Sequence, residues 1–334
     1  MHPGRGYGSP ACARAMADLR AMGATWVSLT PFGRVWDLQP AGIDLRFETP
    51  YRENRANVKA AVRQAHAVGL KVLLVPHLWV ESGQWRAEID PKTPEQWQIW
   101  ADAYEAFLLE WASAAAESGV DLLAIGVEMR SWLTTTHAPS FLPVLKKLRQ
   151  RYHGPLTYAA NWDDVVDTVI LGQLDVIGIN AFYPLTDHEG ASFEEMRQSA
   201  IKLADQVEEL SLAWNKPVIF TEFGYTARKD PALKPWEWPE HLQNVVKSEA
   251  GQALAYRALV SAFIERPWFH GFFVWRVYAD PDDVSQETVW GFSPRGKLAE
   301  LTLRDAFSTH WAVDGLRLPG RSLWQPSAAR IGNY

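Results

Sequence analysis

The stretch Ser118–Glu128, SGVDLLAIGVE, contains the pattern that decides the fold. It begins where a long helix-period segment ends at Gly119, continues through a near-continuous apolar run, and ends in a glutamate. Glycine directly after a helix is typical of a left-handed C-cap, and such an apolar run is typical of a strand covered on both faces. The same order of helix, glycine and strand recurs at Met22-Gly23-Ala24 and Val68-Gly69-Leu70, which indicates βα units and a parallel sheet.

Strand candidates and helical segments alternate along the rest of the chain. The strand candidates are Thr25–Thr30, Lys71–Pro76, Leu122–Glu128, Leu156–Asn161, Val176–Asn180, Pro217–Glu222 and Gly271–Trp275. The helical segments are Pro10–Met22, Glu53–Val68, Pro94–Ser118, Ser140–Arg151, Phe193–Trp214, Ser248–Glu265 and Leu298–Phe307. The alternation predicts an α/β fold, a (β/α)8 TIM-type barrel whose first strand is short or missing at the N-terminus.

The two ends of the chain set the predicted boundaries of the barrel. Residues 1–9 are rich in Gly and Pro and make a poor strand, so we expect the first strand to be truncated. We expect residues 1–312 to form a single catalytic barrel and residues 313–334 to form a C-terminal extension packed on it. The opening residues lack the apolar stretch of a secretory signal. The chain as written is therefore expected to stay in the cytoplasm, and to be secreted if its N-terminus is truncated.

Composition excludes several classes of function. The net charge is -6 and charged residues are interspersed, which gives no electrostatic footprint for nucleic acid or an anionic membrane. No apolar run is long enough to span a bilayer. The His residues form no HxH, HExxH or Cys/His cluster, and no glycine-rich phosphate loop follows a strand, so we expect no metal and no cofactor. We expect a monomer.

Aromatic residues are abundant, with 17 Trp, 14 Phe and 10 Tyr. Indole rings offer flat apolar faces on which the C–H face of a sugar can stack, although Trp also fills protein cores well. The long loops that follow the strand candidates carry many of these rings, and in a barrel this end of the strands carries the chemistry.

Two strand candidates end in glutamate, Glu128 and Glu222. A carboxylate at the end of an apolar strand must be desolvated unless it lines a site. With the absent strand counted as first, the two glutamates end the fourth and seventh strands, which lie roughly opposite at the barrel mouth. A pair about 5–5.5 Å apart suits retaining glycoside hydrolysis, with one carboxylate as nucleophile and the other as acid and then base. The alternative is that each glutamate caps its strand in a salt bridge with a loop arginine.

Strand alternation adds an expectation about neighbouring side chains. If Glu222 points into the barrel, then Phe220 and Val218 share its face. If Glu128 points inward, Ala124 and Gly126 do the same.

Four stretches carry a resemblance to a known family: TWVSLTPFG (25–33), IGVEMRS (125–131), VIGINAFYPL (176–185) and VIFTEFGYTAR (218–228). In their order and spacing they resemble clan A of the glycoside hydrolases, most of all family 113, whose characterised members are endo-β-1,4-mannanases. The resemblance covers residues from about 6 to 308. It implies a retaining β-glycoside hydrolase that acts on β-1,4-mannan or manno-oligosaccharides, with Glu128 as acid/base and Glu222 as nucleophile.

The resemblance also implies roles for neighbouring residues. Tyr183 matches a tyrosine that hydrogen-bonds the nucleophile, and Trp275 matches the aromatic floor under the cleaved sugar; the alternative for each ring is that it serves only for packing. The remaining candidates for substrate binding at the mouth are Asn180, Asn161, Trp162, His77, Trp79 and Arg130.

For some of these residues a plainer reading stands beside the functional one. His77 can satisfy a loop carbonyl, Asn161 can cap the turn before Asp163, and Arg130 either influences the ionisation of Glu128 or is an exposed loop cation. The acid role needs Glu128 to hold a proton, which an ionised Glu222 nearby would favour.

One position departs from the pattern of the clan. Much of the clan places Asn directly before the acid/base, where it binds the sugar 2-hydroxyl, and here that residue is Val127. Another group must supply this contact, or the substrate differs. Two alternatives therefore stay open: the same chemistry on another β-linked polysaccharide, and a non-catalytic carbohydrate-binding barrel.

Overall fold

The computed structural model describes residues 4–47 and 49–310. The helices are α1 (Pro10–Ala21), α2 (Tyr51–Ala67), α3 (Pro94–Ser118), α4 (Arg130–Leu133), α5 (Leu142–Arg151), α6 (Phe193–Trp214), α7 (Glu249–Phe263) and α8 (Leu298–His310). The strands are β1 (Trp26–Leu29), β2 (Phe32–Val35), β3 (Lys71–Leu74), β4 (His77–Val80), β5 (Leu122–Val127), β6 (Leu156–Asn161), β7 (Ile177–Asn180), β8 (Val218–Phe223) and β9 (Phe269–Val274). Short 3-10 helices lie in the connections, among them η1 (Arg86–Glu88).

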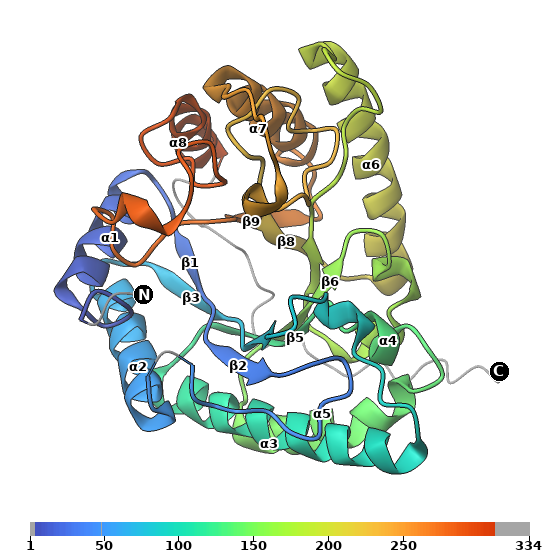
Figure 1. Ribbon diagram of the computed structural model, residues 1–334. Coiled ribbons are helices and arrows are strands. Elements are labelled where there is room, and N and C mark those ends of the chain that lie inside the picture. The colour runs from blue at the N-terminus through green and yellow to red at the C-terminus, as the bar shows by residue number, and fades with distance from the viewer. Residues whose placement is uncertain (1–3, 48, 311–334) are drawn as a thin grey trace.

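The main sheet is a parallel barrel with one open side. Its seven strands follow the order β1-β3-β5-β6-β7-β8-β9, and each neighbouring pair is parallel. Figure 1 looks along the barrel and shows the helices as a ring outside the strands. Every predicted strand overlaps one strand of this sheet, so the predicted α/β barrel is confirmed.

The predicted glycine stops have the expected backbone conformation. Gly23, Gly69 and Gly119 have φ values of 98°, 80° and 74°, in the left-handed region that a side chain disfavours. The two longest helices also begin as their sequences indicate. Thr93 and Gln96 form a capping box on α3, and Ser192 and Glu195 form one on α6.

The open side of the barrel lies between β1 and β9. Residues 4–9 contain turns and no strand, so within the described chain nothing occupies the place of the predicted first strand. A cavity of about 160 Å³ lies between β1 and β9 instead. Its lining comes from α1, β1, β9 and α8 and includes Cys12, Met16, Val27, Phe272 and Leu303. The predicted C-terminal extension, residues 313–334, lies outside the described residues.

Two strands continue beyond the barrel as a separate ribbon that the sequence did not predict. After Pro31 and Pro76 the chain resumes as β2 and β4, which pair in parallel from Phe32 with His77 to Val35 with Val80. Proline has no backbone N–H to donate to a ladder, so it interrupts each strand without ending the pairing. The ribbon projects at the carboxyl ends of the strands, beside the barrel mouth, and brings His77 there.

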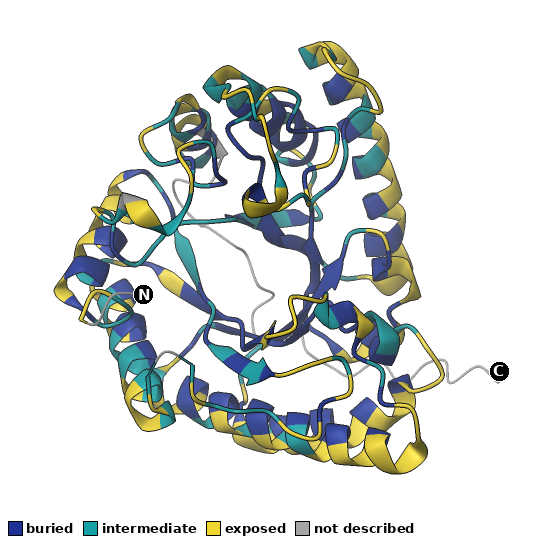
Figure 2. Cartoon of the chain, viewed as in Figure 1, coloured by how far each residue is buried: buried dark blue, intermediate teal, exposed yellow. Residues whose placement is uncertain are grey.

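The core has two layers. A small cluster fills the inside of the barrel and consists of Leu73, Val75, Leu122, Ala124, Val127, Ala159, Val176, Ile219 and Phe273, with Trp26 against it. A larger cluster lies between the sheet and the helices. Figure 2 shows the same arrangement, with buried strands inside and exposure confined mainly to the outer faces of the helices. The interior is therefore a packed core, and chemistry is possible only at its mouth.

Candidate active site

Glu128 follows directly after β5 and has an unusual backbone. Its φ is 49°, in the left-handed region, and its N–H donates to the carbonyl of Ala159 on β6 at 2.8 Å. The register of β5 against β6 shifts between Ala124 and Val127. Ala124 lies in the inner cluster, but Val127 does too, and a Cβ on Gly126 would meet Tyr104 and Tyr158 of the outer cluster, so the alternation predicted from Glu128 is wrong for Gly126. Non-glycine residues adopt this conformation rarely and often at functional sites, and here it accompanies a buried carboxylate at the barrel mouth.

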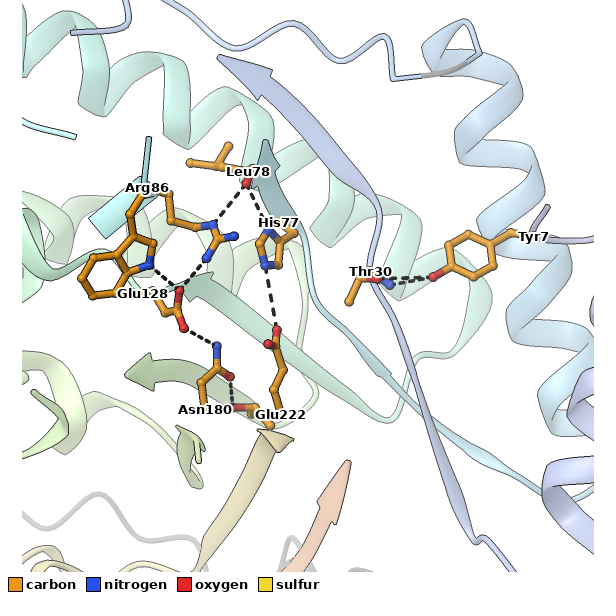
Figure 3. Close-up of polar contacts among 10 residues, drawn as sticks. Tyr7, Thr30, His77, Leu78, Arg86, Glu128, Asn180 and Glu222 are labelled. Carbon is orange, nitrogen blue, oxygen red and sulfur yellow. Dashed lines mark hydrogen bonds and ion pairs between the residues drawn. The ribbon is translucent and has the colours of Figure 1, made fainter. Parts of the chain in front are cut away.

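Three donors hold the Glu128 carboxylate. Trp85 Nε1 and Arg86 Nη1 both donate to Oε2, at 2.8 and 2.5 Å, and Asn180 Nδ2 donates to Oε1 at 3.0 Å. Arg86 in turn donates from Nε to the carbonyl of Leu78 at 3.2 Å (Figure 3). Charge-assisted bonds of this kind stabilise an ionised carboxylate. The donors come from opposite sides, since Trp85 and Arg86 belong to the loop after β4 and Asn180 ends β7.

Glu222 lies in β8 at an irregularity of the sheet. Ile179 pairs with Phe220, but the next residue of β7, Asn180, pairs with Glu222, so Thr221 is the extra residue of a bulge. The alternation predicted for this strand is therefore wrong. Phe220 packs outward against Phe263 of α7 at a centroid distance of 4.7 Å, and Ile219 lies inside the barrel. Val218 also belongs to the outer cluster. The bulge re-aims Glu222 toward the mouth.

The surroundings of Glu222 are poor in donors. The side chain is buried, and its Oε1 has no hydrogen-bond partner within the described chain. Burial and then the nearby charge of Glu128 raise the pKa of Glu222 to about 8, although Arg86 and Arg276 oppose the shift. This shift favours a proton on Glu222 at neutral pH. We expected it on Glu128. Burial of Glu222, whose Oε1 has no donor among the described residues, is the first cause of this shift, whereas Trp85, Arg86 and Asn180 all donate to Glu128.

His77 lies beside Glu222 without a hydrogen bond to it. Its Nε2 is 3.8 Å from Oε1 of Glu222, and its Nδ1 is 3.1 Å from the carbonyl of Leu78. A carbonyl can only accept, so Nδ1 carries the proton and Nε2 faces Glu222 with its lone pair. Burial, followed by the charge of Arg86, holds the pKa of His77 well below its ordinary value. His77 is thus a neutral neighbour of the pair, and it also satisfies a loop carbonyl.

The structure brings Asn180 to the carboxylates and places Tyr183 one step away. Asn180 is fully buried and its amide nitrogen bonds Glu128. The Tyr183 ring packs against Trp162 and Phe220, and burial raises the pKa of its hydroxyl. A bond from that hydroxyl to Glu222 is absent from the described residues, so the role that the resemblance implies for Tyr183 stays a prediction.

Aromatic rings flank the carboxylates in two groups. On the β2–β4 ribbon, Phe32 lies against His77, and Phe32 and Phe47 contact the exposed Trp79. On the opposite side, Trp162 stacks on Trp236 with centroids 5.8 Å apart.

The second group extends toward β9. Trp275 directly follows this strand and contacts Trp238 edge to face, at a centroid distance of 6.5 Å. Arg276 lies over both rings, 5.8 Å from the centroid of Trp275 and 5.6 Å from that of Trp238. Exposed indoles on either side of a carboxylate pair suit the stacking of a sugar chain.

Asn161 and Arg130 take part in a separate network beside the site. Asn161 Nδ2 donates to Asp163 Oδ1 at 2.6 Å, in the manner of a turn cap. Arg130 forms ion pairs with Asp163 and with Asp164, the latter at 2.6 Å, and its guanidinium lies 4.8 Å from the centroid of Trp85. Arg130 therefore contacts the Trp85 ring that donates to Glu128 and does not contact Glu128 itself.

Trp85, Arg86, Thr221 and Arg276 are the residues near the carboxylates that sequence reasoning missed. A signal existed for the first two, because the loop QWRAEID (84–90) follows a strand and contains an aromatic residue and a cation together. Thr221 had no such signal, since its contribution depends on the bulge. The described residues contain no group of three His, Cys, Asp or Glu side chains that could hold a metal ion. None of their helices combines the length and apolar character needed to cross a bilayer.

Comparison with known proteins agrees with this geometry. The family model for Glycoside Hydrolase Family 113 matches residues 2–289. The chain belongs to this family. It is a glycoside hydrolase, and the resemblance carried by the four sequence stretches is confirmed. Among curated proteins, none matches the chain by sequence.

Solved structures of the family share the fold. The GH113 β-mannanase from Alicyclobacillus acidocaldarius, solved in complex with ManMIm, superimposes with a TM-score of 0.77 at 23% identity, covering 91% of this chain and 96% of the other. A complex of a GH113 β-1,4-mannanase gives 0.76 at 20% identity, covering 91% and 97%. More distantly, a β-glucuronidase from Faecalibacterium prausnitzii gives 0.57 at 18% identity, with 90% of this chain and 46% of that chain covered.

Proposed function

We propose that this glycoside hydrolase cleaves β-1,4-mannan or manno-oligosaccharides with retention of configuration, with Glu222 as nucleophile and Glu128 as acid/base. The observation that carries the proposal is the pair itself. Two buried glutamates lie at one barrel mouth, and the charge of Glu128 raises the pKa of Glu222. The substrate class rests on the family and on the mannanases that share the fold.

The chemistry is a double displacement. The Glu222 carboxylate attacks the anomeric carbon while Glu128 gives its proton to the glycosidic oxygen, and the carbon–oxygen bond to the leaving sugar breaks. Glu128, now a carboxylate, takes a proton from water, whose oxygen displaces Glu222 from the anomeric carbon. Two inversions restore the original β configuration.

The pair must hold one proton in total for the first step. The raised pKa of Glu222 favours that proton on Glu222 in the free protein, whereas attack needs it on Glu128. Binding of the sugar must therefore accompany its transfer within the pair. Because the two groups are coupled, the limbs of the pH–rate profile belong to the pair rather than to either residue. Since the pKa of Glu222 is about 8, activity should decline on the alkaline side of that value, where both groups are ionised.

The direct test of substrate and stereochemistry uses mannopentaose. Proton NMR during the first minutes of hydrolysis should show the β anomer of the product before mutarotation mixes the two anomers. A panel of other β-linked oligosaccharides serves for comparison. If mannopentaose is untouched while another member of the panel is cleaved, the mannan assignment is wrong and the chemistry stands. Initial release of the α anomer would contradict retention.

The roles of the two glutamates are separated by alanine variants. Glu222→Ala should lower kcat by at least ~10³-fold, because no covalent intermediate forms. Added azide should then yield an α-glycosyl azide in Glu222→Ala and a β-glycosyl azide in Glu128→Ala. Glu208→Ala, on the outer surface of α6, measures the effect of losing an uninvolved carboxylate. If Glu222→Ala retains wild-type activity, the nucleophile assignment is wrong.

A further inference from the structure

Thr221 is the residue that the β8 bulge adds opposite Asn180. It is buried, and its hydroxyl donates to Oδ1 of Asn180 at 2.9 Å. Asn180 donates from its other end, Nδ2, to Oε1 of Glu128 at 3.0 Å (Figure 3). The bulge thus brings Thr221, the residue before Glu222, into contact with Asn180, whose amide is bonded to Glu128.

The orientation of the Thr221 hydroxyl follows from the packing around Gly178. A Cβ at Gly178 would lie 2.6 Å from Oγ1 of Thr157 and 2.8 Å from Cγ2 of Thr221. The two threonines therefore fill the space over this glycine. Because the Thr221 methyl occupies that space, its hydroxyl is left to point along the barrel toward Asn180.

The hydroxyl decides which end of the Asn180 amide meets Glu128. An amide has a donor end and an acceptor end, which can exchange by a rotation of the side chain. With Thr221 donating to the carbonyl oxygen, the NH₂ group must face Glu128. Without that hydroxyl, the carbonyl oxygen can face Glu128 instead, where it repels a carboxylate and accepts from a protonated carboxyl.

We propose that Thr221, acting through Asn180, is a positioning residue for the acid/base Glu128. The assignment rests on the proposed function for its catalytic meaning.

Other groups also act on Glu128 and must be held constant in any test. Arg86 faces it from η1, Glu222 from β8, Tyr158 from β6, and Asp164 from the turn after β6. A substitution at Thr221 leaves all four in place. A change in the protonation of Glu128 in such a variant then reports on the orientation of the Asn180 amide.

The test compares Thr221→Val with wild type by carbon-13 NMR of glutamate carboxyl groups, with the Glu128 signal assigned by its loss in Glu128→Gln. In Thr221→Val the signal should titrate at a pH higher by about 0.5–1 unit, since the Asn180 amide then no longer holds its donor end toward the carboxylate. Thr221→Ser, which keeps the hydroxyl, should titrate as wild type does. Thr157→Val is the matched control, because the Thr157 hydroxyl donates only to the carbonyl of Val176.

Kinetics provide the second readout. In Thr221→Val, kcat for mannopentaose should fall about tenfold with little change in KM, and the alkaline limb of the pH–rate profile should move upward. An aryl glycoside with an acidic leaving group should be less affected. An unshifted Glu128 titration in Thr221→Val, or an equal shift in Thr157→Val, overturns the inference. If Thr221→Val does not fold, Thr221→Ala only deletes atoms and carries the same expectations. Since the NMR titration needs no turnover, its failure is distinct from a failure of the proposed function.

Discussion

The surroundings of Glu128 and of Glu222 differ although the two carboxylates share one barrel mouth. Glu128 accepts from an indole, a guanidinium and an amide, whereas Oε1 of Glu222 has no partner in the described residues. The two side chains are similarly buried but differ in their donors, and donors stabilise an ionised carboxylate while desolvation opposes it. Burial raises the pKa of Glu222, while donors from the loop after β4 and from β7 hold the carboxylate of Glu128, so depth and the donor set act together on the pair.

Removal of the Arg86 cation should have the largest effect on the difference between Glu128 and Glu222. Arg86→Met eliminates the ion pair with Glu128 and the positive charge that lowers the pKa of Glu222. Both changes favour retention of the proton, so the pH optimum of kcat/KM should move upward. Loss of one partner from a partly buried pair also leaves the other poorly held, and kcat/KM at neutral pH should fall by ~10²-fold. A pH–rate profile measures both.

The control for that variant is Arg149→Met. Arg149 pairs with the buried Asp175 at 2.9 Å, away from the carboxylates, and its loss removes a comparable ion pair. The control should lose stability without a change in pH optimum. An unchanged optimum in Arg86→Met would show that the loop does not set the charge of the pair.

The second-largest effect is expected from Glu222→Gln, on the free energy of unfolding. Its folded pKa of about 8 lies above the ordinary value of 4.5, so the folded state binds the proton more tightly than the unfolded state. The stability associated with that proton is complete below about pH 4.5 and is lost as the pH rises to 8. Glu222→Gln does not titrate, and its advantage over wild type should grow over this range to on the order of 2–4 kcal/mol.

Thermal unfolding at pH 5 and pH 8 checks this prediction. The gain in Tm of Glu222→Gln should be larger at pH 8. A gain that is equal at both pH values, or larger at pH 5, would mean that Glu222 is ionised in the empty site at neutral pH.

The smallest effect is expected from the indole. Trp85→Phe keeps a ring under Arg130 and removes only the Nε1 donor to Glu128. A single hydrogen bond to a charged group contributes about 1.5–3 kcal/mol at most, and two donors remain, so kcat should fall by roughly five- to tenfold. If Trp85→Phe lowered activity as much as Arg86→Met does, the indole would be as important a donor as the guanidinium, and this ranking would be wrong.

Sequence patterns predicted the barrel and its two glutamates because both depend on local features. Gly119 ends a helix, an apolar run follows, and the carboxylate comes last, so the site end of β5 is visible in one stretch. Registers between strands are different. Asn180 opposes Glu222 rather than Thr221 only because β7 and β8 slip by one residue there. Alternation along β8 alone therefore placed Phe220 on the wrong face.

The partners of the carboxylates were missed for a related reason. Arg86 lies 42 residues before Glu128 in a loop, and its contact depends on how the β2–β4 ribbon leads the chain back over the mouth. Arg130 is two residues from Glu128 and was the natural candidate from sequence, yet it pairs with Asp163 and Asp164. The path of the loop, rather than closeness along the chain, therefore determines which arginine contacts Glu128.

The left-handed backbone at Glu128 has a consequence for attempts to improve this protein. An L-residue in that conformation costs roughly 1–2 kcal/mol, and glycine or asparagine adopts it more easily. Selection for heat resistance alone would therefore favour replacement of Glu128, the proposed acid/base. Directed evolution of this scaffold needs a screen for turnover at every round. Substitutions at Glu128 that raise stability are expected to remove activity.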